Sequence, residues 1–600
     1  MKKFLIIITL SLMFSSSLIA CRKSSETTAN NKTDGKSTTV KTKRKNLTGT
    51  SVSEYAVLLN LETWTFLWSS YERFPLIPEV TKMGHLLKVN GENKGIDIRF
   101  AEIQPALAAL KSHYGKIDTL FVDSTTLCTQ EIAEFIKTVK KDRVFVRLSG
   151  EDLSKNTCLE TIHSGELYIE LVEEPSDNVI IALSKIPSLR GLSVSGSHLT
   201  TKSIETISKL VDLKYLKIHN IQKAKLEGLL NLTNLETLAL PSSTIGDGLM
   251  KHLGKLRNIC ALDLSRSKSR IIPSELKKLE KLERLNLKYT DFSGEHVDSI
   301  ANLRNLKFLN IGYTQEFRDK AAEKLTSLKL EELDIEGTGV TEFGLDEIKT
   351  IKTLRVLNIG YLALSPEIMG YLTKLPNLEV LGLASSNLQS KALSRLSKLK
   401  NLRVLDLASS SVDDTVFSAI SILPKLEMLN IDKSKVSARG FTLISNLKNL
   451  KVLSFMDSAL AVGAFRHLSS LEKLRVLKIG GELIDDTIFE SLAGLKSLKN
   501  LRIKSTKITG SNLSNIAHLQ KLTVLDLSGA PLTDTAVSEI ARFASLEQLY
   551  ILDTQITCGG LRVVYKERPR LKVFGVNCSA DEVTGTKKDK SDGLEKPDVR

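Results

Sequence analysis

Aromatic residues are scarce in this sequence: phenylalanine, tyrosine and tryptophan make up 5% of its 600 residues, and only two are tryptophan. A globular chain of this length usually divides into several domains with separate cores. Here leucine is very frequent, and the 13 prolines and 34 glycines are scattered along the chain. This composition favours an internally periodic chain over a set of unrelated globular domains.

Catalytic motifs are also absent from the sequence. The nine histidines are scattered, without His-Glu-x-x-His or paired Cys-x-x-Cys spacing for a metal. There is no Gly-x-x-x-x-Gly-Lys-Ser/Thr loop for phosphate and no Gly-x-Ser-x-Gly elbow for a hydrolase. The segments outside the repeats are too short for an added catalytic domain. The sequence predicts no enzyme, no metal and no cofactor, and an enzyme of unrecognised type is the least favoured alternative.

The net charge of +15 does not indicate a nucleic-acid partner. Residues 1–20 carry a net charge of +2, residues 22–50 a net +6 and residues 577–600 a net −1. The excess left on residues 51–576 is mild for that length, and no basic helix or aromatic-plus-arginine stripe accompanies it.

The N-terminus has features of an export signal. Two lysines precede an apolar run over residues 4–14, which is too short for a transmembrane helix. Residues 18–21, Leu-Ile-Ala-Cys, resemble the lipobox of bacterial lipoproteins. This resemblance implies cleavage after residue 20 and lipid on the sulfur of Cys21. An ordinary secretory signal followed by a chance cysteine is the alternative.

Residues 21–50 are interpreted as a flexible basic tether, because they are rich in Ser, Thr, Asn and Lys and contain almost nothing to bury. The tether would span roughly 30 Å. Contact of its charge with anionic lipid is the less favoured alternative. Arg22 is not the Asp that signals inner-membrane retention in some Gram-negative bacteria, so the outer membrane or cell surface is favoured.

The strongest signal is a repeated Leu-x-x-Leu-x-Leu motif over residues 189–576. It begins seventeen times, and thirteen of the sixteen intervals are 24 residues. The starts are Leu189, Leu213, Leu235, Ile259, Leu282, Leu306, Leu330, Leu354, Leu378, Leu402, Leu426, Leu450, Leu474, Leu498, Leu522, Leu546 and Leu571.

Each repeat is predicted to contain one short strand and one short helix. In the motif, alternate residues face the same side of a strand, so leucines face inward at positions four and six. Leu249, Leu253 and Leu256 follow helical spacing in a return segment. The repeats resemble the leucine-rich repeat superfamily, most of all bacterial 24-residue repeats with a Thr turn. This resemblance implies an α/β solenoid, a horseshoe with a parallel β-sheet on the concave face and helices on the convex face.

Position nine of the motif is Ser or Thr in 12 of the first 16 repeats. Many leucine-rich repeats carry Asn there. A hydroxyl can bond the backbone of the turn, so this column is predicted to be structural.

The array's two ends are predicted to differ from its middle. Residues 51–116, with Trp64 and Trp68, are interpreted as an N-terminal cap and degenerate start, with a separate aromatic binding module as the alternative. Residues 117–188 are predicted to be degenerate repeats, and residues 577–600 a disordered charged tail.

Cysteine pairing is an expectation for an exported chain. Cys558 and Cys578 lie one repeat apart and are a possible disulfide, as are Cys128 and Cys158. Cys260 is then left alone.

The candidate binding site lies on the predicted concave face. Position five, called here the middle column, is mainly Asp or Asn, and position eight, called the turn column, holds three tyrosines. Aromatic anchors beside polar groups are typical of protein-binding patches. The candidate residues are Tyr289, Phe308, Asn310, Tyr313, Asp334, Asn358 and Tyr361. A purely structural middle column that hydrogen-bonds along the sheet is the alternative. Lys478, Arg502 and Lys504 make a basic spot farther along.

The sequence therefore predicts a lipid-anchored cell-envelope protein that binds a protein, or a glycan, through its concave face. A structural envelope scaffold without one specific ligand is the alternative. The ligand itself is not predicted.

Overall fold

The computed structural model describes residues 86–89, 92–97, 119–123, 143–148 and 166–171, and residues 174–576 except 389, 411, 459, 505, 569 and 570. The chain forms two compact units, which divide after Ser386. Residues 1–85 and 577–600 lie outside this description, so the predicted signal, tether and tail stay predictions.

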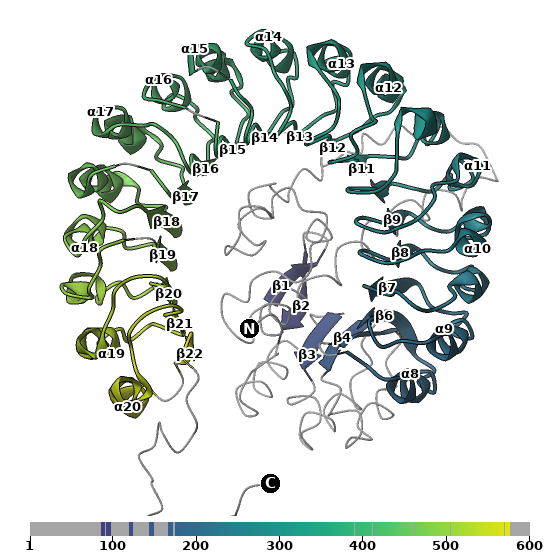
Figure 1. Cartoon of the computed structure of the whole chain (residues 1–600), viewed down its shortest axis with the longest axis horizontal. Coiled ribbons are helices and arrows are strands. Elements are labelled where there is room, and N and C mark those ends of the chain that lie inside the picture. Colours follow the sequence, from purple (N-terminus) through teal and green to yellow (C-terminus); the bar gives the residue numbers. More distant parts are fainter. Residues whose placement is uncertain are drawn as a thin grey trace, which may run out of the picture. The chain divides into compact units, whose positions relative to one another are not determined.

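In the first unit, strands follow one another at the spacing of the motif (Figure 1). They are β1 (Leu86–Val89), β2 (Glu92–Asp97), β3 (Thr119–Asp123), β4 (Arg143–Leu148), β5 (Glu166–Leu171), β6 (Leu189–Ser195), β7 (Tyr215–His219), β8 (Thr237–Ala239), β9 (Ala261–Asp263), β10 (Arg284–Asn286), β11 (Phe308–Asn310), β12 (Glu332–Asp334), β13 (Val356–Asn358) and β14 (Val380–Gly382).

The return segments of this unit are short helices. The α-helices are α8 (Asp177–Leu183), α9 (Thr201–Ile207), α10 (Asp247–Met250), α11 (Pro273–Leu276), α12 (Asp319–Lys324), α13 (Glu342–Ile348) and α14 (Ile368–Leu372). The 3-10 turns are η3 (Glu227–Asn231), η4 (Leu253–Lys255), η5 (Gly294–Ser299) and η6 (Leu325–Ser327).

The second unit continues the same pattern. Its strands are β15 (Val404–Asp406), β16 (Met428–Asn430), β17 (Val452–Phe455), β18 (Val476–Gly480), β19 (Asn500–Lys504), β20 (Val524–Asp526), β21 (Gln548–Tyr550) and β22 (Lys572–Phe574). Its helices are α15 (Ser390–Leu393), η7 (Ser394–Lys398), α16 (Thr415–Ile420), α17 (Ala438–Phe441), η8 (Thr442–Asn446), η9 (Val462–Ser470), α18 (Ile488–Leu492), η10 (Leu513–Ile516), η11 (Asp534–Ala536), α19 (Val537–Ala541) and α20 (Cys558–Glu567).

From β6 onward, the strands within each unit pair in parallel with their neighbours, in register from repeat to repeat. Phe308 pairs with Glu332 across β11 and β12, and Val452 pairs with Val476 across β17 and β18. The strands form one side of each unit, here called the strand face, and the helices form the other (Figure 1). The predicted α/β solenoid of strand-and-helix repeats is confirmed.

The motif leucines form the core between the two sides. Leu309 of β11 and Leu333 of β12 are fully buried, as are Leu253 and Leu256 of the return segment. Burying a leucine side chain contributes about 2 kcal/mol, so the stacked leucines are the main source of stability. The hydrophobic period in the sequence thus fixes both the strand register and the helix face.

The parallel sheet continues before residue 189. Strands β3, β4 and β5 pair in parallel with one another, and β5 pairs with β6. In contrast, β1 and β2 pair antiparallel. The interpretation of residues 117–188 as degenerate repeats stays a prediction, because much of this range lies outside the described residues.

The turn after each strand has a fixed backbone conformation. From Asn220 onward, every described residue of the turn column has a positive φ, for example 61° at Asn220 and 62° at Gly337. The position-nine hydroxyl closes this turn: Thr290 Oγ1 donates to Leu287 O at 2.6 Å, and Thr338 Oγ1 donates to Ile335 O at 2.7 Å. The predicted structural role of the hydroxyl column is confirmed.

On the helix side, aspartates link neighbouring repeats in a way that the sequence analysis missed. Asp534 Oδ1 accepts the backbone N–H of Thr557 at 2.7 Å, and Asp534 Oδ2 accepts the hydroxyl at 2.7 Å. Thr557 is the N-cap of α20. The same arrangement recurs in other repeats, in most cases at the N-cap of a helix. The pairs are Asp177 with Thr200, Asp319 with Thr341, Asp414 with Ser437 and Asp486 with Thr509.

One of these links predicts a pH dependence. Burial alone would raise the pKa of Asp177, but hydrogen bonds from Ser203 and Thr200 lower it below its ordinary value. A lowered folded-state pKa stabilises the fold above the unfolded pKa, and this stability is lost as the pH falls through the folded pKa. We expect Asp177→Ala to cost about 1 kcal/mol at pH 7, and this cost should shrink progressively as the pH falls below the unfolded pKa of about 4. Thermal unfolding of both proteins between pH 7 and about pH 3 tests this, and a pH-independent difference would contradict it.

Two described cysteines, Cys260 and Cys558, are both disulfide-bonded. The expectation that Cys260 is left alone is therefore wrong. Cys128, Cys158 and Cys578 lie outside the described residues, so the pairs Cys558 with Cys578 and Cys128 with Cys158 stay predictions.

Candidate ligand-binding face

The middle column supports the turns of the strand face. The side-chain oxygens of Asn310, Asp334 and Asn358 each accept the backbone N–H two residues later, at 3.0, 3.1 and 3.1 Å. All three residues are buried. Asp406 and Asn430 of the second unit make the same bond. The structural alternative is therefore the better interpretation of this column, since its acceptors serve the backbone.

Phe308 is not the exposed anchor that the sequence predicted. It lies on β11 and is only 1% exposed, and the guanidinium of Arg284 lies 4.5 Å from the ring centroid. Position three faces outward in the motif, but neighbouring strands lie only about 4.8 Å apart. A large ring in this position is covered by the side chains beside it.

The turn column, in contrast, brings the three predicted tyrosines together. The rings of Tyr289 and Tyr313 are stacked, with centroids 4.4 Å apart and planes at 6°. Tyr361 lies against Tyr313, with centroids 5.8 Å apart and planes at 53°. Tyr289 and Tyr361 are 39% and 55% exposed. These three residues, here called the tyrosine cluster, are the part of the predicted site that the structure assembles at the surface.

Two neighbours set the position of the cluster. The guanidinium of Arg266, the preceding turn-column residue, lies 4.4 Å from the Tyr289 ring centroid. On the other side, a Cβ at Gly337 would lie 2.7 Å from the ring of Tyr313. Glycine at position 337 therefore leaves room for the Tyr313 ring.

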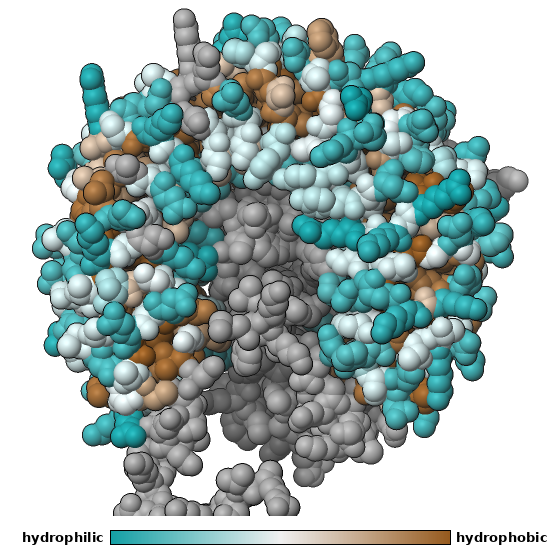
Figure 2. Space-filling view, in the orientation of Figure 1, coloured by the Kyte–Doolittle hydropathy of each residue, from teal (hydrophilic) through white to brown (hydrophobic). Residues whose placement is uncertain are grey.

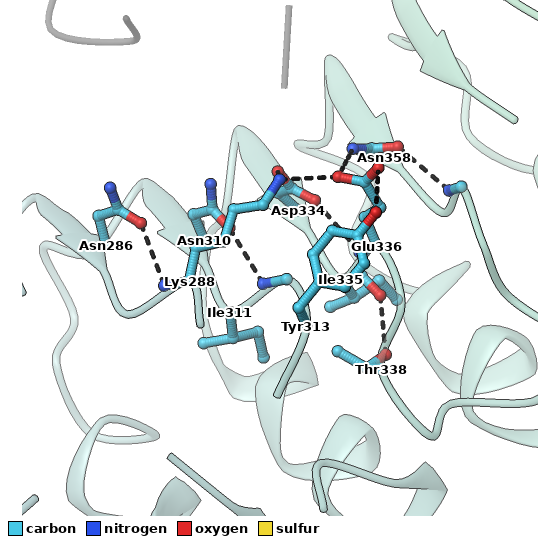
Figure 3. A network of polar contacts seen from close by, with 12 residues as sticks. Asn286, Lys288, Asn310, Ile311, Tyr313, Asp334, Ile335, Glu336, Thr338 and Asn358 are labelled. Atoms are coloured by element: carbon cyan, nitrogen blue, oxygen red, sulfur yellow. Dashed lines mark hydrogen bonds and ion pairs between the residues drawn. The ribbon is translucent and has the colours of Figure 1, made fainter. Parts of the chain in front are cut away.

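Beside Tyr313 of the cluster, the buried ammonium of Lys288 pairs with two carboxylates, those of Asp334 and Glu336 (Figure 3). Lys288 Nζ lies 3.8 Å from Asp334 Oδ2. Lys288 Nζ lies 2.7 Å from Glu336 Oε2, and the two side chains are 6% and 11% exposed. Glu336 Oε1 accepts the Tyr313 hydroxyl at 3.2 Å, and Glu336 Oε2 accepts Asn358 Nδ2 at 3.3 Å. The ammonium of Lys288 also lies 5.2 Å from the Tyr313 ring centroid. One carboxylate thus connects the middle column to the tyrosine cluster.

The sequence analysis missed Lys288 and Arg266, although a signal for Lys288 was present. Position seven runs Lys288, Gly312, Glu336 and Gly360. Lys288 and Glu336 have opposite charges and lie two repeats apart. Gly312, in the repeat between them, has no side chain, so the two long side chains have room to meet above it.

Burial, followed by the charge of Glu336, raises the pKa of Tyr313 well above its ordinary value. The phenol therefore stays protonated at neutral pH and donates to Glu336. A proton held in this way orients the ring and does not indicate acid–base chemistry.

Hydrophobic side chains elsewhere on the described surface are more scattered than the tyrosine cluster. In the view of Figure 2, hydrophilic side chains cover most of the described surface and hydrophobic ones form separate patches. Among the described residues, no group of three or more His, Cys, Asp or Glu side chains is placed to hold a metal ion.

None of the helices that the structure describes is both long and apolar enough to cross a membrane.

Comparisons with known proteins agree with this architecture. A family model described as a leucine-rich repeat region matches residues 171–419 and 344–564. A search of curated proteins finds no match.

Several solved structures are similar in fold. An internalin (inlF) from Listeria monocytogenes is 19% identical over 53% of this chain and 87% of its own, with a TM-score of 0.40. A Leptospira interrogans LRR protein is 19% identical over 79% of this chain and 99% of its own, with a TM-score of 0.34. The ectodomain of the Arabidopsis thaliana receptor kinase GASSHO1/SCHENGEN3, solved with CASPARIAN STRIP INTEGRITY FACTOR 2, is 16% identical over 81% of this chain and 68% of its own, with a TM-score of 0.33.

Proposed function

The chain belongs to the leucine-rich repeat family, and from this premise we propose that it binds a protein ligand through the tyrosine cluster and catalyses no reaction. Proteins of this family are typically binding scaffolds. The proposal places the contact at the turn edge of the strand face, because the middle-column residues Asn310, Asp334 and Asn358 are buried and each uses a side-chain oxygen to accept a backbone N–H.

The observation that carries the proposal is the backbone conformation of the cluster. Tyr289, Tyr313 and Tyr361 have φ values of 57°, 58° and 57°. This left-handed region costs a residue other than Gly, Asn or Asp about 1 kcal/mol. The same column also holds residues that suit this conformation, such as Asn220, and others that bear a similar cost, such as Lys433. The tyrosines differ in that three large aromatic side chains accept this cost close together, and a binding role accounts for it.

The chemistry of the cluster favours a protein over a glycan. Tyr289 has Arg266 on one side of its ring and Tyr313 on the other, so little of its ring face is free for a sugar to stack on. Its edge and hydroxyl remain for polar contacts with a polypeptide. Tyrosine and arginine together are common anchors of protein interfaces.

The first test separates binding from stability. Replacing Tyr361 with Asn keeps a residue that tolerates a positive φ, so we expect the melting temperature to stay the same or rise slightly. Affinity for the protein partner should fall at least tenfold, as expected for loss of an exposed aromatic anchor. The full chain serves as bait for an envelope extract. The control is Phe343→Asn on α13, where the side chain is 73% exposed.

If Tyr361→Asn and Phe343→Asn retain the same partner with the same affinity, the cluster is not the binding surface. If the unaltered chain captures no partner, the second function is favoured, a structural envelope scaffold without one specific ligand. The turn column holds three neighbouring tyrosines in one part and mostly small or polar residues elsewhere. This concentration of aromatic side chains favours ligand binding over a purely structural role.

We propose further that the protein is exported and held at a bacterial outer membrane or cell surface through lipid on Cys21. The support is the sequence at residues 18–21 and the polar tether that follows it. In cells fed an alkyne fatty acid, the full chain should become labelled, and Cys21→Ser should abolish the label. Label that persists in Cys21→Ser would contradict the anchor.

A further inference from the structure

The second position of the motif forms a column of alternating charge. Over eight consecutive repeats an acid and a base follow one another: Glu283, Lys307, Glu331, Arg355, Glu379, Arg403, Glu427 and Lys451. Backbone bonds hold neighbours side by side, as from Lys451 N to Glu427 O at 2.7 Å. Their side chains pair within each unit. In the first unit Arg355 lies 2.8 Å from Glu379, and in the second Lys451 lies 3.0 Å from Glu427.

The alternation ends at β17. After Lys451, the next two residues of the column are Arg475 and Lys499. Arg475 N donates to Lys451 O at 2.8 Å, and Lys499 N donates to Arg475 O at 2.7 Å, so the three cations are adjacent. Like charges on neighbouring strands are destabilising. Three adjacent cations therefore lower the stability of the fold, whereas a continued alternation of acid and base would not.

Glu427 offsets only the first of these cations. Within the described part of the chain, neither Arg475 nor Lys499 forms an ion pair. Arg475 is exposed and Lys499 is half-buried. The side chains of both residues therefore have their positive charge available to a partner.

The same strands carry further positive charge at the predicted basic spot. Lys478 and Arg502 occupy the middle column of β18 and β19, and Lys504 ends β19. Asp526 of β20 offsets part of this charge, since it lies 2.6 Å from Arg502 and 3.7 Å from Lys504. Strands β17 to β19 themselves contain no acidic residue. Asp432, whose carboxylate interacts with Lys478, offsets a further part. Arg475 is the most exposed of the cations on these strands.

We propose that Lys451, Arg475 and Lys499, here called the cation strip, bind a short acidic segment of a polypeptide. Strands lie about 4.8 Å apart, and side chains on one side of an extended peptide repeat every ~6.7 Å, so long cations on neighbouring strands reach successive carboxylates. Two unpaired cations match two or three carboxylates. They are too few for a nucleic-acid backbone, and Phe455, the aromatic residue of β17, is only 1% exposed and offers no stacking surface.

The test uses a variant that restores the alternation. Arg475→Glu places an acid between Lys451 and Lys499, so the fold should be kept or stabilised. In the full chain at about 20 mM salt, where surface charges are weakly screened, binding of a fluorescein-labelled octaglutamate peptide should weaken at least tenfold. Arg466→Glu is the matched control: it makes the same charge change on an exposed residue of η9, and binding should be unchanged.

The outcomes separate the alternatives. If octaglutamate binds Arg475→Glu as tightly as the unaltered chain, the proposal that the cation strip binds acidic peptides is wrong. Equal weakening in Arg466→Glu would contradict it as well. Tighter binding of single-stranded DNA or a heparin oligosaccharide that is lost in Arg475→Glu also overturns the acidic-peptide assignment. If Arg475→Glu lowers the melting temperature, Arg475→Gln replaces it, with a weakening of about threefold expected. Tyr361→Asn should leave octaglutamate binding intact, so the strip and the tyrosine cluster succeed or fail separately.

Discussion

Replacing Lys288 with methionine is expected to destabilise the first unit by about 3 kcal/mol, because the buried carboxylates of Glu336 and Asp334 both lose the Lys288 cation. The ammonium and the Glu336 carboxylate lie 2.7 Å apart, and both side chains are almost fully buried. Glu336 also holds Tyr313 and Asn358. The loss should therefore be concentrated in strands β10 to β13. Hydrogen exchange of the full chain measures it locally, which matters because a repeat array need not unfold in one step.

A second pair provides the control for this prediction. Lys307 lies 3.4 Å from Glu283, but its side chain is 52% exposed. Exposed pairs contribute about 0–1 kcal/mol, so Lys307→Met should have little effect. The double variant Lys288→Met with Glu336→Leu should recover only part of the lost stability. It removes the Glu336 charge, but Asp334, whose buried Oδ2 lies 3.8 Å from the Lys288 ammonium, still loses that cation. Equal effects of Lys288→Met and Lys307→Met would show that burial of the first pair is unimportant.

Phe441→Ala is expected to have an effect as large in the second unit, about 3–5 kcal/mol. Phe441 ends α17 and is fully buried. Its ring centroid lies 5.1 Å from that of Phe455 on β17 and 5.5 Å from that of Phe465 on η9. The three rings join a strand to the helices of two repeats. The cavity left by alanine should loosen β17, where the cation strip begins.

The measurement is again hydrogen exchange, with thermal unfolding as support. Phe441→Leu keeps most of the volume and should cost clearly less than alanine. An exposed phenylalanine, Phe343 at 73% exposure, gives the baseline, and its change to alanine should stay within about 0.5 kcal/mol. If Phe441→Ala matched that baseline, the aromatic packing of the second unit would not be a source of its stability.

The sequence predicted the fold well because the repeat imposes one solution. A leucine at positions one, four and six of successive repeats can be buried only if strands stack in parallel and in register. The structure confirms this from Leu309 and Leu333 to Leu453 and Leu477, all fully buried. The hydroxyl column was also predictable, because a small hydroxyl beside a turn has few other partners.

The site was predicted only in part, for physical reasons. Side-chain type alone does not reveal that Asn310 and Asp334 are occupied by their own backbone, since the same residues on an open strand could face a ligand. Burial of Phe308 depends on its neighbours across the sheet. The pairing of Lys288 with Glu336 spans two repeats and depends on the space above Gly312. The three tyrosines were found because a rare residue type recurred at one motif position.

The most direct test of the central claim, that the tyrosine cluster contacts a protein ligand, is site-specific photo-crosslinking. Two variants of the full chain are made, one with a benzophenone amino acid in place of Tyr361 and the other with it in place of Phe343. Each variant is irradiated in the cells that produce it. We predict one protein adduct from position 361, lost when Tyr289→Asn and Tyr313→Asn are added, and no such adduct from position 343. No adduct from position 361, or the same adduct from both positions, would contradict the account.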